Sequence, residues 1–432
     1  MAKQLQLRGG TTAEHSTFTG ANREVTVDTT KKTVVVHDGS TAGGIPLATE
    51  ESMYGLFQGG TETFQGAYGL NWDETNDTYT RTGTNNFTAI QSQMKRCVLN
   101  TDGTVNYYLH PNDSTKKMDG SAATLDGTDG NVMVEIPKFY YKYNYNTSTG
   151  VVHEHSISLT EDSGYVVHPA FVKNGVEQDH RYYPAYLGYR TGGKVLSRSG
   201  VYPSVNFTRA TARSEAAANG TGWHQLDFLL YEAVTLLVII EYGTMNIQEA
   251  LGQGRTALSG GSWSGGSYIG INGLSNSLGN GSGNVTYGGD ADDAGADYSF
   301  MSYRGCENLF GNVWRFLDGI NISDRVPYIN DNPSTYADDV FTGDYVSAGI
   351  TMSSSNGYGR NLANSGKGFF PTSVSGGSSS AGTTDYFYQN SGNRISLVGG
   401  NALDGLYAGP LSLAVSIDSG AAAVNFGCAV AR

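Results

Sequence analysis

A single long stretch of the chain has the spacing of an α-helix, and the scarcity of long helical patterns restricts the fold more than any other feature. In "HQLDFLLYEAVTLLVIIEYGT" (224–244), apolar side chains recur three or four positions apart, and Gly243 stands near the expected C-terminal end. Elsewhere, short runs of alternating apolar and polar residues are separated by Gly, Asn and Asp. With 59 Gly and 28 Tyr in 432 residues, the sequence predicts a mainly β protein with few helices.

The first part of the chain predicts a small β unit. "REVTVDTTKKTVVVHDGSTAGG" alternates apolar and polar side chains within residues 1–50, and Gly residues mark its turns. These fifty residues contain too few apolar side chains to close a core alone. We therefore expect the unit to pack against copies of itself in an oligomer.

Two further units follow in this interpretation. Residues 51–129 predict a small β spacer, with a short helix from Ile90 to Cys97 and a strand pair joined at Asp102-Gly103. Residues 130–432 would form the last and largest unit. It opens with the strongest strand pattern, "NVMVEIPKFYYKYNY" (131–145).

The charge pattern excludes several classes of partner. The chain has a net charge of −13 and no cluster of Lys and Arg, so we expect no nucleic-acid partner. The most apolar run, Leu226 to Ile240, contains Asp227 and Glu232, and is too short and too charged to cross a membrane. The start "MAKQLQLRGG" lacks the apolar stretch of a signal peptide, so we expect synthesis in a cytoplasm.

Some residues could carry chemistry, but each also has a structural interpretation. A glycan hydrolase needs two carboxylates roughly 5–10 Å apart, and the candidates are Asp227, Glu232, Glu241 and Asp318. We favour structural roles, with Glu241 pairing near a helix end and Asp318 holding the turn into Gly319. The sequence therefore predicts no enzyme, and a glycan-degrading enzyme stays the alternative.

The candidate metal ligands and the cysteines likewise have either a chemical or a purely structural interpretation. On a strand, His153 and His155 would face one side and could bind a metal, although we favour a solvated loop. Closely spaced acids could hold a structural calcium ion, and they are Asp290, Asp292, Asp293 and Asp297. We favour no cofactor here. Three distant cysteines predict buried, reduced thiols, and they are Cys97, Cys306 and Cys428.

The stretch "ENLFGNVWRFLDG" (307–319) predicts a packing device. Gly311 would allow a positive φ or a close approach of the backbone to a neighbour. Asn312 would hold the turn by bonding to nearby backbone, and Trp314 would anchor the core. By itself the motif implies no catalysis.

Together with the terminal "NFGCAVAR", this motif resembles the formylglycine-generating-enzyme-like branch of the C-type-lectin fold. The stretches "IPKFYY", "HPAF" and "IIEYGTMNIQEALGQG" resemble phage tail-fibre members of that branch. The N-terminal "LQLRGGTTAEHSTFTGANREVTVDTTKKTVVVHDGSTAGGIPLA" is similar to the major tropism determinant family of phage tail-tip proteins. The chain departs from the enzymes at Arg315-Phe316, where they carry Glu-Trp, and it lacks their Cys pair.

The resemblance implies a homotrimer that adsorbs a virion to a bacterium. Residues 1–50 would form a β-prism-like trimerisation unit attached to other tail or baseplate proteins. Residues 130–432 would form a C-type-lectin-like domain that binds a surface protein or glycan. The location would be the virion, after assembly in the host cytoplasm. Matching positions nominate eight receptor-binding residues, which are Tyr386, Tyr388, Asn390, Asn401, Leu403, Asp404, Tyr407 and Asp418.

Overall fold

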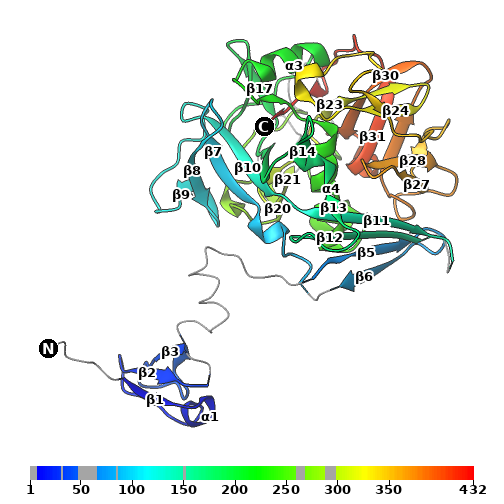
Figure 1. Ribbon diagram of the computed structural model, residues 1–432. Helices are drawn as coiled ribbons and strands as arrows, with labels where there is room; N and C mark the ends of the chain where they lie inside the picture. The colour runs from blue at the N-terminus through cyan, green and yellow to red at the C-terminus, as the bar shows by residue number, and fades with distance from the viewer. Residues whose placement is uncertain are drawn as a thin grey trace. The chain divides into compact units, whose positions relative to one another are not determined.

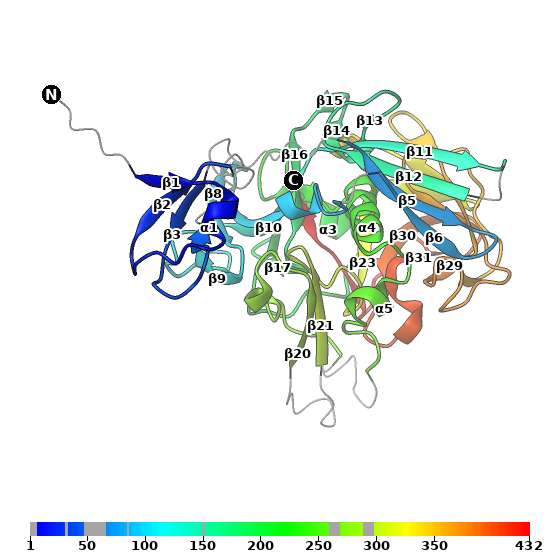
Figure 2. The ribbon, with the colours of Figure 1, turned by 90° about the horizontal axis from the view of Figure 1, so that it is seen from below.

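The computed structural model describes residues 7–30, 33–46, 66–83, 86–148, 152–258, 268–287 and 298–432 (Figure 1). The chain divides into two compact units, Met1–Gln65 and Gly66–Arg432. Strands outnumber helices in the described part of the chain (Figures 1 and 2). The prediction of a mainly β fold with few helices is therefore confirmed.

The first unit contains a four-stranded sheet and a single helical turn. The sheet order is β1 (Arg8–Gly10), β2 (Val25–Asp28), β3 (Thr33–Val36) and β4 (Ile45–Pro46), and the turn is α1 (Thr12–His15). β1 runs parallel to β2, and the other two pairs are antiparallel.

The inner face of this sheet is largely polar. The Thr26 hydroxyl lies 2.8 Å from His15 Nε2 and 2.9 Å from His37 Nε2, and all three side chains are buried. Val35 is the one buried aliphatic side chain among the described residues of this unit. The interior thus provides little hydrophobic stabilisation, as the composition of this segment predicts.

Apolar side chains gather on the opposite face of the sheet. The register pairs Val25 with Val36 and Val27 with Val34, and it pairs Val36 with Ile45. Directly paired residues of adjacent strands point to the same side, so these five side chains form one patch. Val25 is 37% exposed and Ile45 is 54% exposed. We call these five residues the valine face.

The second unit contains three large sheets. One has the order β16 (His180–Pro184), β10 (Asn131–Pro137), β7 (Lys95–Leu99), β8 (Val105–His110) and β9 (Asp113–Lys117). The next has the order β13 (Val166–Val167), β11 (Tyr140–Asn146), β12 (Val152–Ser158), β5 (Tyr68–Asp73) and β6 (Thr78–Gly83).

The third sheet occupies the last third of the chain. Its order is β25 (Val346–Ser347), β24 (Val326–Ile329), β23 (Trp314–Ser323), β30 (Asn393–Gly399), β31 (Gly409–Ile417), β29 (Tyr386–Gln389) and β26 (Gly357–Tyr358), and β32 (Phe426–Gly427) pairs with β23. Smaller sheets complete the described part of the unit. Four have two strands, and they are β14 (Val172–Lys173) with β15 (Val176–Glu177), β17 (Gly188–Thr191) with β18 (Lys194–Ser197), β19 (His224–Gln225) with β33 (Val430–Ala431), and β27 (Asn361–Asn364) with β28 (Phe369–Ser373). One has three strands, β20 (Gly283–Tyr287), β21 (Tyr298–Tyr303) and β22 (Cys306–Glu307).

The prediction of a separate spacer at residues 51–129 is wrong for its described part. β7 pairs with β10, and β5 pairs with β12, so the strands from this region are integral parts of the large sheets. The sequence cannot show this, because the partner strands lie far along the chain. The predicted helix from Ile90 to Cys97 is also wrong: a 3-10 turn (Gln91–Gln93) leads directly into β7.

Two other predictions concern residues 102–145. The strand pair around Asp102-Gly103 is confirmed, because β7 and β8 flank this turn and Gly103 has a φ of +84°. The single strand expected at 131–145 is two strands in different sheets, β10 and β11. The break follows Pro137, whose ring removes a ladder donor.

Helix α4 (Phe228–Tyr242) lies in the centre of the second unit (Figure 2). Asp227 caps its first turn by accepting from Leu230 N at 3.0 Å, and Gly243 ends it with a φ of +71°. The helix is buried from Phe228 through Ile240 and contacts β5, β16 and β23, one strand of each large sheet. The predicted helix is confirmed. Two shorter helices are α3 (Arg209–Ala217) and α5 (Ile247–Leu251).

Candidate functional site

Three of the nominated tyrosines meet in one cluster. The Tyr386 ring centroid lies 4.6 Å from that of Tyr388 and 4.4 Å from that of Tyr407. Tyr358, which the sequence did not indicate, lies 5.3 Å from Tyr386 and 5.4 Å from Tyr407. We call these four residues the tyrosine cluster.

Strand pairing explains how the cluster forms. Tyr358 is directly opposite Tyr386 in the antiparallel pair of β26 and β29. Tyr386 and Tyr388 are two positions apart in β29 and share a face, whereas Phe387 between them is 1% exposed and enters the core. A 3-10 turn (Gly405–Tyr407) brings Tyr407 to the same place.

The cluster reaches the surface together with two leucines. Tyr407 is 42% exposed, Leu403 is 42% exposed and Leu406 is 54% exposed. Tyr386 and Tyr388 are half-buried, and the Tyr388 ring packs against Trp314 at 5.9 Å. The result is an aromatic and aliphatic surface on a fixed base, which gives contact area at little conformational cost.

Asn401 and Asp404 support this surface from within the loop. Asn401 is 5% exposed, and its side-chain oxygen accepts from Leu403 N at 2.8 Å. An Asp404 carboxylate oxygen accepts from Asn401 N at 2.8 Å. Burial raises the pKa of Asp404 to about 6, although hydrogen bonds from Asn401 and Trp314 act the other way. Asn401 thus presents little surface to a receptor, and its receptor contact stays a prediction.

Asn390 and Asp418 are exposed at the other end of the same strands. Asn390 Nδ2 donates to Ser416 O at 3.1 Å, and Asp418 accepts from Gly420 N at 3.0 Å. Asn390 follows Tyr388 by two residues, which is about 7 Å along an extended strand, so it lies at the edge of the tyrosine cluster.

The Gly-Asn motif fixes the loop that carries Tyr407. Gly311 has a φ of +77°, and its N–H donates to Gly399 O at 2.9 Å. Asn312 has a φ of +65°, and its carbonyl accepts from Ala402 N at 3.1 Å. The Asn312 side chain accepts from Gly270 N at 2.8 Å and donates to Gly270 O at 3.1 Å. One rigid turn thus connects the core to both flanking loops.

A buried carboxyl group lies behind the cluster. Asp385 is 3% exposed, and it accepts from Leu411 N at 2.7 Å. Burial raises its pKa well above the ordinary value for an aspartate. A Cβ at Gly409 would lie 2.0 Å from an Asp385 oxygen, so the close approach of these two strands requires glycine at this position.

The turn between β5 and β6 holds the loops around Tyr358 and Tyr386, which no local sequence pattern predicts. Asp77 accepts from Gly382 N at 3.0 Å, from Arg360 Nη1 at 3.0 Å and from Trp72 Nε1 at 3.3 Å. Glu74 accepts from His153 Nε2 at 2.9 Å and also from Asn361 Nδ2. These carboxylates join residues that are some 300 positions apart in the chain.

The carboxylates considered for catalysis have structural partners. Asp227 caps α4, Asp318 pairs with Arg213 at 2.6 Å, and Glu241 pairs with Arg304. Glu232 accepts from Phe369 N at 2.9 Å, and burial raises its pKa to about 8. The roles predicted for Glu241 and for Asp318, which accepts from Gly319 N at 3.1 Å, match these contacts.

The histidine pair is buried and not solvated, so the favoured loop interpretation is wrong. His153 and His155 lie on β12 with their ring centroids 6.4 Å apart, and they are 1% and 2% exposed. Within the described ranges, no group of three His, Cys, Asp or Glu residues could hold a metal ion. The acidic residues nominated for calcium lie outside the described residues. All three cysteines are buried and free, as predicted.

No helix among the described residues is long and apolar enough to span a membrane.

Comparisons with known proteins find one specific match at the N-terminus. Residues 5–41 match the family described as "Major tropism determinant N-terminal domain". A curated relative, the tail fiber receptor-binding protein of Bordetella phage BPP-1, is 63% identical over 57 residues. This segment is 13% of the present chain and 15% of the relative.

Solved structures of the major tropism determinant I1 and M1 variants align with 99% of this chain and 98% of theirs. Their sequence identities are 17% and 15%, and both TM-scores are 0.23. Scores this low support no argument about the fold of the present chain.

Proposed function

We propose that this chain, which carries a major tropism determinant N-terminal domain, is a phage tail-fibre protein that adsorbs the virion to a bacterial surface receptor. The observation that carries the proposal is the 63% identity over 57 residues to a tail fiber receptor-binding protein. The N-terminal unit would attach to other tail or baseplate proteins. The protein would thus be located in the virion.

The tyrosine cluster is the surface that we propose for receptor contact. Tyr407, Leu403 and Leu406 are exposed at its edge, and the core holds the half-buried tyrosines still. Rigid aromatic side chains lose little entropy on binding, which suits recognition of a surface protein or glycan. The protein would act by adhesion without breaking bonds in its receptor. A C-type-lectin-like fold for residues 130–432 stays a prediction.

We further propose that the protein works as a homotrimer joined through the valine face. The first unit has a polar interior and an exposed apolar patch, so a second copy of the same patch would complete its core. Three linked receptor surfaces raise the effective affinity by orders of magnitude even when each contact is weak.

Competition for adsorption tests this function. The purified full-length chain is added to the propagating host before the phage that carries this chain, and free phage are counted. We expect the chain to block adsorption, and Tyr407→Ala to weaken the block about tenfold or more, because an exposed aromatic anchor is removed. Tyr202→Ala is the matched control, since Tyr202 is 53% exposed and lies outside the cluster. If a saturating amount of the chain leaves adsorption unchanged, the proposed function is wrong.

A further inference from the structure

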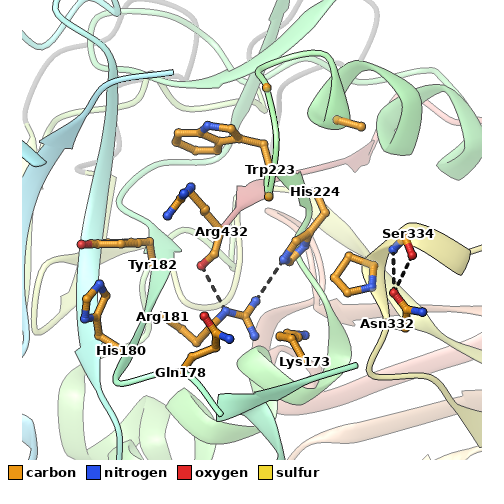
Figure 3. A pocket seen from close by; sticks show the side chains of 14 residues that line it. Lys173, Gln178, His180, Arg181, Tyr182, Trp223, His224, Asn332, Ser334 and Arg432 are labelled. Carbon is orange, nitrogen blue, oxygen red and sulfur yellow. Dashed lines mark hydrogen bonds between the residues drawn. The ribbon is translucent and has the colours of Figure 1, made fainter. Parts of the chain in front are cut away.

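A cavity of 510 Å³ lies in the second unit, and no residue of the tyrosine cluster lines it (Figure 3). Its wall combines segments that are far apart in the sequence, near Lys173, Arg181, Trp223, Ser334 and Arg432. This volume is within the range of about 300–1,000 Å³ that is usual for small-molecule sites.

The charge of the wall is opposite to that of the whole chain. Lys173, Arg181 and Arg432 contribute cations to the cavity, and its lining contains no Asp or Glu. The chain as a whole has 40 acidic and 27 basic residues. A cationic hollow in an acidic protein attracts anionic ligands.

Two of these cations share one carboxylate oxygen outside the wall. Lys173 Nζ lies 3.1 Å from Asp227 Oδ2, and an Arg181 nitrogen lies 2.8 Å from the same atom. Their side chains are 12% and 3% exposed. Burial and the charge of Arg181 lower the pKa of Lys173 to about 8, although Asp227 and Asp331 act the other way. Asp227 and Asp331 thus lie near this pair of cations, and Arg432 adds a further positive charge to the wall.

The wall also presents one N–H donor without a protein partner in the described ranges, on Lys173. Within the described part of the chain, Asp227 and Tyr336 take two of the three N–H groups of Lys173, which leaves one. Arg432 Nε is buried and has no hydrogen-bond partner among the described residues. That atom is sealed from the cavity, and Arg432 Nη2 donates to Asp102 O at 2.9 Å, so Lys173 supplies the donor that a ligand can reach.

The remaining wall has groups that suit a sugar ring. Trp223 provides an aromatic surface, and Gln178, Asn332 and Ser334 provide amide and hydroxyl groups (Figure 3). Figure 3 shows Arg181 among these residues, bonded to the Arg432 carbonyl and to His224. Burial lowers the pKa of His224 to about 3, so this ring is neutral and leaves the positive charge to Lys173 and the arginines.

We propose that the cavity binds an anionic sugar unit, with its carboxylate or phosphate group at Lys173. The site goes beyond receptor contact by the tyrosine cluster, because the two share no residue. Carboxylated and phosphorylated sugars have the same negative charge and hydroxyl groups, and separate ligands distinguish them.

Calorimetric titration of the full-length chain tests the site. The probes are methyl β-D-glucuronide, glucose 6-phosphate and the neutral methyl β-D-glucoside. We expect at least one anionic sugar to bind with a Kd of about 1 mM or below, and the neutral glucoside to bind at least about tenfold more weakly. Raising the salt from about 50 mM to about 500 mM should weaken the binding. Equal affinity for the charged and neutral sugars would overturn the proposal, as would no binding of either anionic sugar.

Matched lysine variants localise the binding. Lys173→Gln should weaken it about fivefold or more, because a charge-assisted hydrogen bond is removed. Asp227 would keep Arg181 as its partner, and thermal unfolding checks that the variant is folded. Lys142→Gln makes the same change at an exposed lysine outside the cavity and should bind like the unaltered chain. A folded Lys173→Gln variant with unchanged affinity would contradict the site. If no sugar binds in the titrations, the adsorption experiment still tests the proposed function independently, because the titrations use no cells.

Discussion

At the scale of single residues, the structure leaves no room for a side chain at Gly311 of the Gly-Asn motif. Its φ is +77°, and a Cβ there would lie 2.6 Å from Arg255 O. Gly311→Ala therefore combines a left-handed backbone with a collision against main chain that cannot move away. We expect a loss of about 3 kcal/mol or more in the free energy of unfolding, measured by denaturant titration.

Gly343→Ala separates these two effects. Gly343 has a φ of +67°, but nothing lies within 4 Å of the position of a Cβ. The control should lose only the conformational part, about 1–2 kcal/mol. Equal losses for the two alanine variants would show that the contact with Arg255 does not constrain the motif.

At the scale of elements, the β5–β6 turn controls how firmly the tyrosine cluster is held. Asp77→Asn keeps a side chain that tolerates the φ of +53° at this position, but replaces one acceptor oxygen with a donor group. The bonds to Gly382 N and Arg360 should weaken. We expect faster amide hydrogen exchange in residues 376–385 and weaker competition for adsorption, although Asp77 itself is not in the cluster.

Asp73→Asn is the control in the same turn. Asp73 accepts from Thr75 N and from the backbone and side chain of Asn76. These bonds join residues of the turn to one another and do not reach residues 376–385. Exchange in residues 376–385 should therefore be unchanged in this variant. If both variants loosen that segment equally, the effect comes from the turn as a whole and not from the bonds of Asp77.

Local patterns allowed prediction of some elements but not of their long-range pairing. Helix α4 could be predicted because its apolar spacing and the terminal Gly243 are local signals. The spacer was mispredicted because β5 and β7 pair with strands some 35 to 85 positions later in the chain. The resemblance nominated Tyr386 and Tyr388, but Tyr358 joins them only through a strand pairing between residues 28 positions apart.

Local sequence patterns also fail to reveal which residues the two candidate sites bring together. The resemblance nominated Tyr407, Leu403 and Asn401 alike, and only the structure distinguishes the two exposed side chains from Asn401, which is buried in its loop. The cationic cavity gave no local signal, because its lysine and arginines are scattered from position 173 to position 432. Only the folded chain brings such residues together.

At the scale of the whole molecule, the valine face predicts the oligomeric state. Val36 is paired with both Val25 and Ile45, so it lies in the middle of this patch. If three copies bury the patch, light scattering after size-exclusion chromatography should give about three times the 45.9 kDa of one chain. Val36→Asp places a charge in the proposed contact and should give the mass of a single chain, because a buried unpaired carboxylate is strongly unfavourable.

Thr19→Asp adds the same charge at an exposed position off the patch and should leave the trimer intact. A single-chain mass for the unaltered protein, or a Val36→Asp variant that remains trimeric, would contradict assembly through this face.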